Sequence, residues 1–159
     1  MQSWIRNLLY LAALSLLSPW LLWRHCKTGR YRASWKQQLF GFTSHPAADS
    51  QPMPNCIWMH GVSVGEIQML APLLRLLQSR WPTASLAVST TTDSGMQLAQ
   101  KLMPENVRLF YFPLDFSWAV ERTLKTLKPS LIVLGELELW PNLIDAAKRS
   151  GVPLAVING

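Results

Sequence analysis

Short apolar stretches alternate with stretches of helical periodicity between residues 55 and 159. The apolar stretches predict strands at residues 56–61, 85–91, 107–112, 131–134 and 152–157. The segments between them predict helices at residues 65–79, 93–102, 115–127 and 140–149. Strands that alternate with helices are typical of an α/β fold with a parallel sheet and right-handed crossovers. The sequence therefore predicts an α/β domain of this kind.

The first predicted strand runs directly into the first predicted helix, through residues Ile57–Gln68. Gly61 and Gly65 let the backbone turn sharply there and come close to a ligand. The start of the helix offers backbone N–H groups and the positive end of the helix dipole, which favour an anion. Ser63 and Glu66 fit the Ser-x-x-Glu capping box, in which the carboxylate only binds a backbone N–H. The local pattern by itself favours capping by Glu66 over catalysis.

Polar residues also follow the other predicted strands, at the same edge of the sheet. Ligands of open parallel sheets bind beyond the carboxyl ends of the strands, so these residues are candidates for a site. Asp93 and Asp115 fit helix N-caps. Glu136 and Glu138 are harder to explain, because carboxylates after a short apolar strand are costly to bury without a partner or a task. With the carboxylate of the first turn, they predict three carboxylates at one edge.

The net charge of +6 comes from the N-terminal part of the chain. Residues 1–48 hold six basic residues and no acidic one, whereas residues 49–159 hold nine of each. A nucleic-acid binder more often carries a basic face on its folded domain, so this distribution argues against nucleic acid as a partner. Cys26 and Cys56 suggest no disulfide framework and fit a reducing compartment. The three histidines have no metal-ligand spacing, so the sequence predicts no metal site and no cofactor.

Residues 4–23 form a mostly apolar run of the length that crosses a bilayer as a helix. Tryptophans near both ends fit interfacial anchors, and no small-residue cleavage site follows the run. Arg6 and Pro19 leave an interfacial helix as the alternative. The basic residues from Arg24 to Lys36 place the following side in the cytoplasm. The sequence thus predicts a membrane anchor at 1–24, a basic juxtamembrane segment and linker at 25–54, and a folded domain at 55–159.

Four ordered motifs lie at the ends of predicted strands: His60–Glu66, Thr90–Gly95, Phe112–Asp115 and Glu136–Asn142. With Gly29–Trp35 and the N-terminal apolar run, they resemble the 3-deoxy-D-manno-octulosonic acid (Kdo) transferases of lipopolysaccharide synthesis. The resemblance implies the N-terminal half of a GT-B glycosyltransferase, in which two Rossmann-like domains enclose a cleft. It also implies that the C-terminal, donor-binding domain is absent from this chain.

The resemblance implies transfer of Kdo from CMP-Kdo to a lipid A precursor, lipid IVA, by inverting and metal-independent chemistry. Such a transfer passes through an oxocarbenium-like state and needs one base on the face opposite the leaving group. By motif position, Glu66 matches the general base, and Glu136 matches a residue that stabilises the transition state. The substrate-binding positions that the resemblance implies are Ser63, Gly65, Thr92, Gly95 and Glu138. It places the protein at the cytoplasmic face of the bacterial inner membrane.

Two other function classes fit a sheet of this kind. A nucleotide-dependent oxidoreductase would have Gly-x-Gly-x-x-Gly after the first strand, but Gly61 and Gly65 have a different spacing. A non-catalytic, membrane-anchored Rossmann-like binding module remains the alternative to a transferase. A structural role likewise remains the alternative to substrate binding for Glu138.

Overall fold

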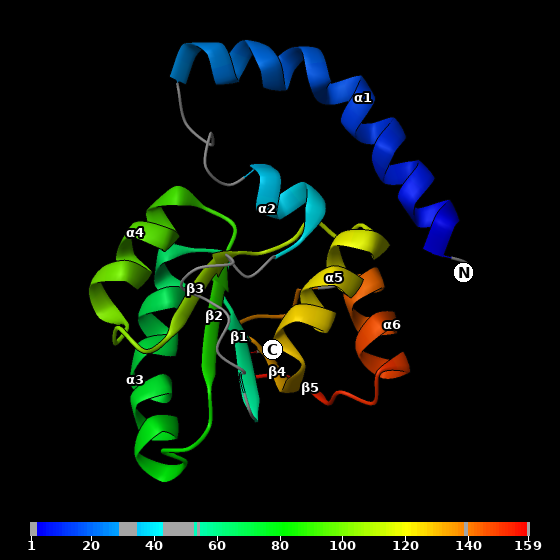
Figure 1. Cartoon of the computed structure of the whole chain (residues 1–159). Coiled ribbons are helices and arrows are strands. Elements are labelled where there is room, and N and C mark those ends of the chain that lie inside the picture. The colour runs from blue at the N-terminus through cyan, green and yellow to red at the C-terminus, as the bar shows by residue number, and fades with distance from the viewer. Residues whose placement is uncertain (1–2, 29–34, 43–52, 54, 139, 159) are drawn as a thin grey trace.

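The computed structural model describes residues 3–28, 35–42, 53, 55–138 and 140–158 (Figure 1). Its strands are β1 (Cys56–His60), β2 (Leu86–Thr90), β3 (Arg108–Tyr111), β4 (Pro129–Leu134) and β5 (Leu154–Val156). Its helices are α1 (Ser3–Thr28), α2 (Trp35–Phe40), α3 (Val64–Arg80), α4 (Asp93–Leu102), α5 (Ser117–Leu127) and α6 (Pro141–Arg149). The strands and helices predicted from residue 55 onward are all present, and α2 is an addition that the pattern does not predict.

The strands form one parallel sheet in the order β3-β2-β1-β4-β5. The predicted parallel α/β sheet is therefore confirmed, and its topology is Rossmann-like. The chain adds β2 and β3 on one side of β1 and then β4 and β5 on the other, so the strand order reverses between β1 and β4. In open α/β sheets, this switch point leaves a crevice at the carboxyl ends of the two strands, where ligands bind.

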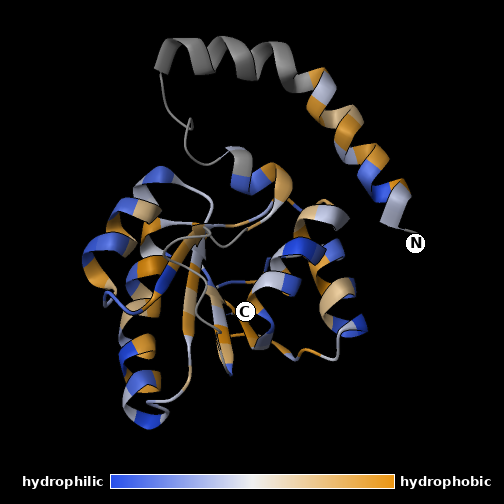
Figure 2. Ribbon diagram, viewed as in Figure 1, coloured by the Kyte–Doolittle hydropathy of each residue, from blue (hydrophilic) through white to orange (hydrophobic). Residues whose placement is uncertain are grey.

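Helices cover both faces of the sheet (Figure 1). Because side chains alternate along a strand, Ile57 and Met59 pack with α3 and α4, whereas Cys56 and Trp58 pack with α5 and α6. Figure 2 shows the apolar residues gathered on the strands and on the inward sides of the helices. Each large side chain buried in these two cores contributes about 1.5–3 kcal/mol. The two cores fix the positions of the strands, and therefore of the residues that follow their carboxyl ends.

The start of α6 is capped from another part of the chain. Asp115 was expected to be the N-cap of its own helix, and this prediction is wrong because α5 begins two positions later, at Ser117. The Asp115 carboxylate instead accepts the backbone N–H groups of Asn142 and Leu143, both at 2.9 Å. These N–H groups have no partner within α6, so a buried carboxylate from a neighbouring loop satisfies them.

The first part of α1 docks on the domain through polar side chains. Arg6 is buried, its Nε donates to Oδ1 of Asn142 at 2.9 Å, and its guanidinium pairs with Asp145. Asn7 donates from Nδ2 to Oγ of Ser117 at 2.8 Å. These contacts join α1 to the starts of α5 and α6.

Among the helices of the described residues, none combines the length and apolar character needed to cross a membrane. The membrane span predicted for residues 4–23 is therefore not supported. The polar side chains of Arg6 and Asn7 reduce the hydropathy of this run.

The predicted basic segment and linker fall largely outside the described residues. Phe42 is described, and it belongs to the core: its ring lies 4.7 Å from that of Phe110, and its backbone N–H donates to Thr123. Gly41, just before it, has a φ of 81°, and a β-carbon there would lie 2.2 Å from the carbonyl oxygen of Ala119. The chain can therefore approach α5 this closely only with glycine at that position.

Candidate active site

Glu66 lies in the first turn of α3, beyond the carboxyl end of β1, and only 5% of its surface is exposed. Its Oε1 accepts the backbone N–H of Ser63 and its Oε2 accepts that of Val62, both at 2.9 Å. Ser63 Oγ in turn accepts the N–H of Glu66 at 3.2 Å. The predicted capping box is therefore confirmed. It holds the carboxylate in one orientation at the switch point of the sheet.

Two glycines, one after β1 and one after β4, let the backbone of both segments come close to Glu66. A β-carbon on Gly61 would lie 2.9 Å from Cβ of Glu66 and 3.2 Å from Cδ1 of Leu70. Gly135 follows β4 and donates its N–H to the carbonyl oxygen of His60 at 2.8 Å. A β-carbon on Gly135 would lie 3.3 Å from Oε2 of Glu66. The loop between β4 and α6 therefore lies directly against the Glu66 carboxylate.

This loop carries the other two predicted carboxylates. Glu136 is exposed, and its carbonyl oxygen accepts the N–H of Glu138 at 2.8 Å. Glu138 is half-buried; its Oε2 accepts the Nε1 hydrogen of Trp140 at 3.0 Å and lies 3.2 Å from Nε2 of His60. Burial alone would raise the pKa of Glu138, but the His60 ring beside it and the hydrogen bond from Trp140 lower the pKa below its ordinary value. The three carboxylates thus lie at one edge in three different environments.

The start of α4 is tied to the turn beside Glu66. Its N-cap is Thr92, whose Oγ1 accepts the N–H of Gly95 at 3.1 Å; Asp93, expected to be the cap, lies inside the first turn, so that prediction is wrong. Thr92 Oγ1 also donates to the carbonyl oxygen of Val62 at 3.2 Å. A β-carbon on Gly95 would lie 2.4 Å from Oγ1 of Thr90. Thr92 and Gly95 therefore have structural contacts here, and their binding of substrate stays a prediction.

Ser63 and Gly65 are the exposed members of the predicted set at the start of α3. The nearest atom that a β-carbon on Gly65 would meet is Oγ of Ser63, at 3.8 Å. A substrate group can therefore approach the positive end of the α3 dipole beside them. Within the described ranges, no group of three or more His, Cys, Asp or Glu side chains could hold a metal ion.

His60 and Asn142 are buried residues of this edge that sequence reasoning did not assign to the site. The His60 ring stacks on Phe112, with ring centroids 3.8 Å apart. Asn142 accepts a hydrogen bond from Arg6 and donates through Nδ2 to the carbonyl oxygen of Asp115. His60 opens one sequence motif and Asn142 closes another, which is the signal that could have found them.

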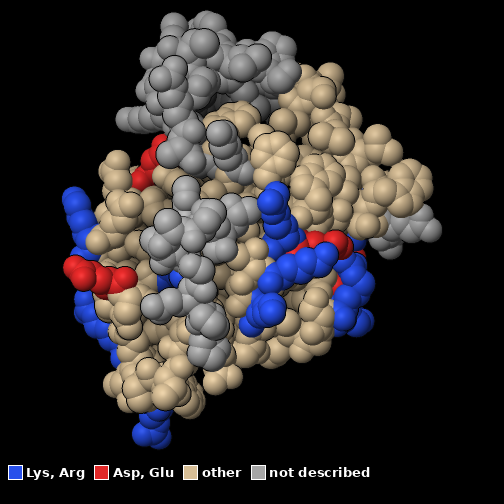
Figure 3. Space-filling view, viewed as in Figure 1, with Lys and Arg blue, Asp and Glu red and all other residues tan. Residues whose placement is uncertain are grey.

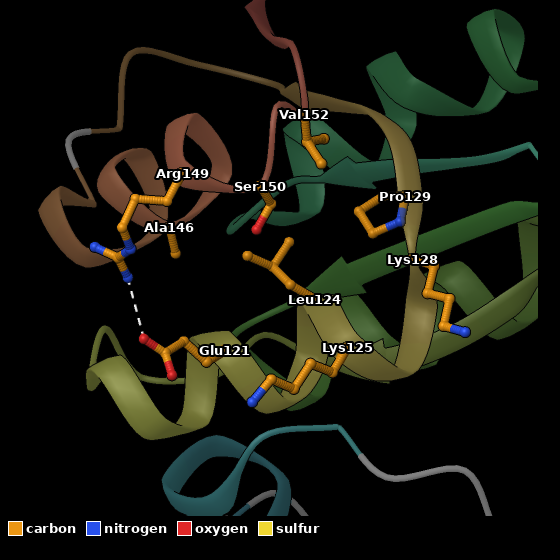
Figure 4. A pocket seen from close by; sticks show the side chains of 9 residues that line it. All are labelled: Glu121, Leu124, Lys125, Lys128, Pro129, Ala146, Arg149, Ser150 and Val152. Atoms are coloured by element: carbon orange, nitrogen blue, oxygen red, sulfur yellow. Dashed lines mark hydrogen bonds and ion pairs between the residues drawn. The ribbon is translucent and has the colours of Figure 1, made fainter.

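A surface pocket of about 540 Å³ lies between α5 and α6 (Figure 4). It is lined by Glu121, Leu124, Lys125, Lys128, Pro129, Ala146, Arg149, Ser150 and Val152. Arg149 pairs with Glu121 at 3.1 Å across its mouth, and basic side chains gather over these helices in the space-filling view (Figure 3). Pro129 is the first residue of β4, so this pocket lies at the opposite edge of the sheet from Glu66.

Comparison with known proteins agrees with the motifs. The family model described as 3-deoxy-D-manno-octulosonic-acid transferase (kdotransferase) matches residues 33–159. The chain is 34% identical over 142 residues to the 3-deoxy-D-manno-octulosonic acid transferase of Chlamydophila psittaci, covering 89% of this chain and 32% of that protein. It is 32% identical over 132 residues to the enzyme of the same name from Haemophilus influenzae, covering 83% of this chain and 30% of that protein.

A third relative, from Bordetella pertussis, has the same name and is 31% identical over 160 residues, covering 94% of this chain and 36% of its own length. The chain thus spans about a third of the length of the curated relatives it matches. The residues that the family model matches include α2 and the whole sheet, and Glu66, Glu136 and Glu138 are among them. The chain therefore belongs to the 3-deoxy-D-manno-octulosonic acid transferases, a family of glycosyltransferases.

Proposed function

We propose that the protein containing this chain transfers Kdo from CMP-Kdo to a lipid A precursor such as lipid IVA. One observation carries the proposal: a Kdo transferase domain holds the Glu66 carboxylate, by two backbone N–H groups, at the switch point of its sheet. Ligands of such sheets bind at that point. The acceptor is assigned to this domain, and CMP-Kdo to the second Rossmann-like domain of a GT-B enzyme.

In the proposed reaction, Glu66 takes the proton of the attacking acceptor hydroxyl. The hydroxyl oxygen bonds to the anomeric carbon of Kdo, while the bond from that carbon to the CMP phosphate breaks and CMP leaves with the electron pair. Attack opposite the leaving group inverts the anomeric carbon. Each Glu66 oxygen accepts one backbone N–H, so each keeps a lone pair for the proton. The phosphate leaves as an anion, which is why this route needs no protein acid or metal ion.

Glu136 supplies the second carboxylate of the proposal. It is exposed, on the loop that Gly135 brings against Glu66. A carboxylate there stabilises the positive charge that develops on the oxocarbenium-like sugar. Ser63 and Gly65, exposed at the positive end of α3, suit a polar or anionic group of the substrate.

We further propose that the protein works at the cytoplasmic face of the inner membrane. The support is α1, which exposes large apolar side chains although its Arg6 and Asn7 dock on the domain. Figure 2 shows hydrophobic and hydrophilic residues alternating along the N-terminal part of this helix. The exposed apolar residues are Trp4, Leu8, Leu9, Leu11 and Leu16. A helix with one docked polar side and exposed apolar residues suits the membrane interface. Flotation with anionic lipid vesicles tests this: the chain should float with the vesicles, and Leu8→Glu with Leu16→Glu should weaken that binding.

A transfer assay tests the main proposal. The full-length protein, incubated with CMP-Kdo and lipid IVA, should give a Kdo-bearing lipid detectable by mass spectrometry. Glu66→Ala should abolish that product. A wild-type protein that binds lipid IVA but yields no product would favour the non-catalytic binding module.

A further inference from the structure

His60 is the last residue of β1, and its side chain is completely buried. The ring stacks on Phe112 with an angle of 22° between the two planes. Its Nδ1 lies 3.0 Å from both Oγ and the carbonyl oxygen of Ser89, and its Nε2 lies 3.2 Å from Oε2 of Glu138. The reaction proposed above gives this ring no task.

The neighbours of His60 limit where its ring can carry hydrogen. Trp58 donates from Nε1 to Ser89 Oγ at 2.8 Å, so the serine hydroxyl can donate its own hydrogen to Nδ1, whereas the Ser89 carbonyl oxygen, also 3.0 Å from Nδ1, can only accept one from it. A ring with its hydrogen only on Nδ1 would turn the Nε2 lone pair toward a carboxylate oxygen. Nε2 has no regular hydrogen-bond partner among the described residues, and Oε2 of Glu138 is the acceptor within reach. A hydrogen on Nε2 is therefore the arrangement that suits the 3.2 Å approach of this carboxylate oxygen.

Glu138 connects this ring to the loop that carries Glu136. Its Oε2 also accepts the Nε1 hydrogen of Trp140, so the rings of Trp140 and His60 both lie against one carboxylate oxygen. Its backbone N–H donates a hydrogen bond to the carbonyl oxygen of Glu136 at 2.8 Å. The residue before Glu136 is Gly135, which lies against Glu66. A path of contacts therefore runs from the buried ring to the backbone of Glu136 and, through Gly135, to the Glu66 carboxylate.

We propose that His60 is a positioning residue, which donates from Nε2 to Glu138 and thereby sets where Glu136 stands relative to Glu66. The inference rests on the proposed Kdo transfer, in which these two carboxylates act on one reaction. A misplacement of about 1 Å at a reacting group can cost on the order of 100-fold in rate, so such an anchor has a measurable effect on turnover. Glu138 then serves the loop and not the substrate.

Two substitutions separate the Nε2 contact from the packing of the ring. His60→Phe keeps a ring to stack on Phe112 and removes both nitrogens, whereas His60→Gln removes the ring and keeps an N–H near the place of Nε2. In the full-length enzyme, His60→Phe should lower kcat by roughly 10- to 100-fold and leave KM for both substrates within about twofold. His60→Gln should retain more turnover than His60→Phe. The reverse order would overturn the proposal, because it would make His60 a packing residue only.

The same variants in a Glu138→Ala background test the route of the effect. If His60 acts through Glu138, His60→Phe should change kcat little there, because the anchor is already lost. An equal loss of kcat in both backgrounds would contradict the proposal.

Thr123→Val is the matched control for lost stability. Thr123 is buried in α5, and its Oγ1 accepts the N–H of Phe42 at 2.9 Å. This variant should lower the thermal midpoint and leave kcat unchanged.

Hydrogen exchange measured on the chain itself gives a readout independent of catalysis. His60→Phe should speed exchange in residues 135–140 more than His60→Gln does, and Thr123→Val should not. If the wild-type enzyme shows no transfer, the proposed function fails. Hydrogen exchange alone then tests whether His60 holds the loop through Glu138. Equal exchange rates of residues 135–140 in His60→Phe and wild type would overturn the proposal that His60 holds this loop.

Discussion

Glu66→Gln perturbs both the capping box and the proposed base, and the structure shows how to separate the two effects. The Glu66 carboxylate accepts Ser63 N–H through Oε1 and Val62 N–H through Oε2. Glutamine has one oxygen and one NH₂ group, so one of these backbone donors would face another donor. Sequence alone suggests that glutamine preserves most of this turn. The paired backbone bonds revise that expectation, because a carboxylate can serve both donors and an amide cannot.

The size of the stability effect follows from these contacts. A donor left without a partner costs about 1–3 kcal/mol when buried. Both hydrogen bonds are only partly buried, so the lower part of that range, about 1–2 kcal/mol, applies here. In a protein of more than about 150 residues this corresponds to a fall of roughly 2–8 °C at most in the thermal midpoint. Loss of a general base costs about 10²–10⁴ in rate, which is far beyond what this loss of stability explains.

Turnover and thermal midpoint should be measured together on full-length Glu66→Gln, on wild type and on Thr123→Val. Thr123→Val loses the hydroxyl partner of the Phe42 N–H, so it should show a similar fall in midpoint with nearly normal turnover. Glu66→Gln should match that midpoint and lose at least about 100-fold in turnover. A Glu66→Gln enzyme within about tenfold of wild type would refute the reasoning. Glu66 would then be a helix cap only, and Glu136 would become the leading catalytic candidate.

Gly95→Ala should destabilise the domain by about 1–3 kcal/mol, measured by urea unfolding, because its β-carbon would lie 2.4 Å from Oγ1 of Thr90. An unchanged midpoint would show that the start of α4 can shift at no cost. Asp115 provides a pH test: burial raises its pKa above 3.8, although hydrogen bonds from Asn142 and Leu143 oppose the rise. The stability that this group contributes is fully present below about pH 3.8 and is lost as pH rises through the raised pKa. The unfolding free energy of wild type relative to Asp115→Asn should therefore be larger at about pH 3 than at about pH 7, and an equal or opposite difference would contradict this.

The elements of the sheet were predictable because their signals are local. Apolar runs of strand length and helical spacing gave every strand and helix from β1 onward, and the Ser-x-x-Glu pattern gave the capping box at Glu66. The short helix α2 was missed, since six residues carry too little periodicity to distinguish a helix from a loop.

Contacts between distant parts of the chain were not predictable in the same way. Asp115 has the composition and place of an N-cap for the helix that follows it, yet its partners are at positions 142 and 143. Arg6 sits in an apolar run that suggested a membrane span, but its guanidinium reaches Asn142 and Asp145. Local pattern identifies a group that needs a partner, and tertiary packing decides which partner it finds.

The residues of the motif Glu136–Asn142 have separate structural tasks. Asn142 is 2% exposed and bonds Arg6 of α1 and Asp115 of the loop before α5, so its amide joins three segments. Glu138 is bound by Trp140 and lies against His60, so it anchors the loop. Glu136 alone among the motif's carboxylates is exposed at the switch point. The loop that carries this exposed carboxylate is held at three places: by the capped helix α6 after it, by the buried His60 that contacts Glu138, and by Gly135, which lies against Glu66.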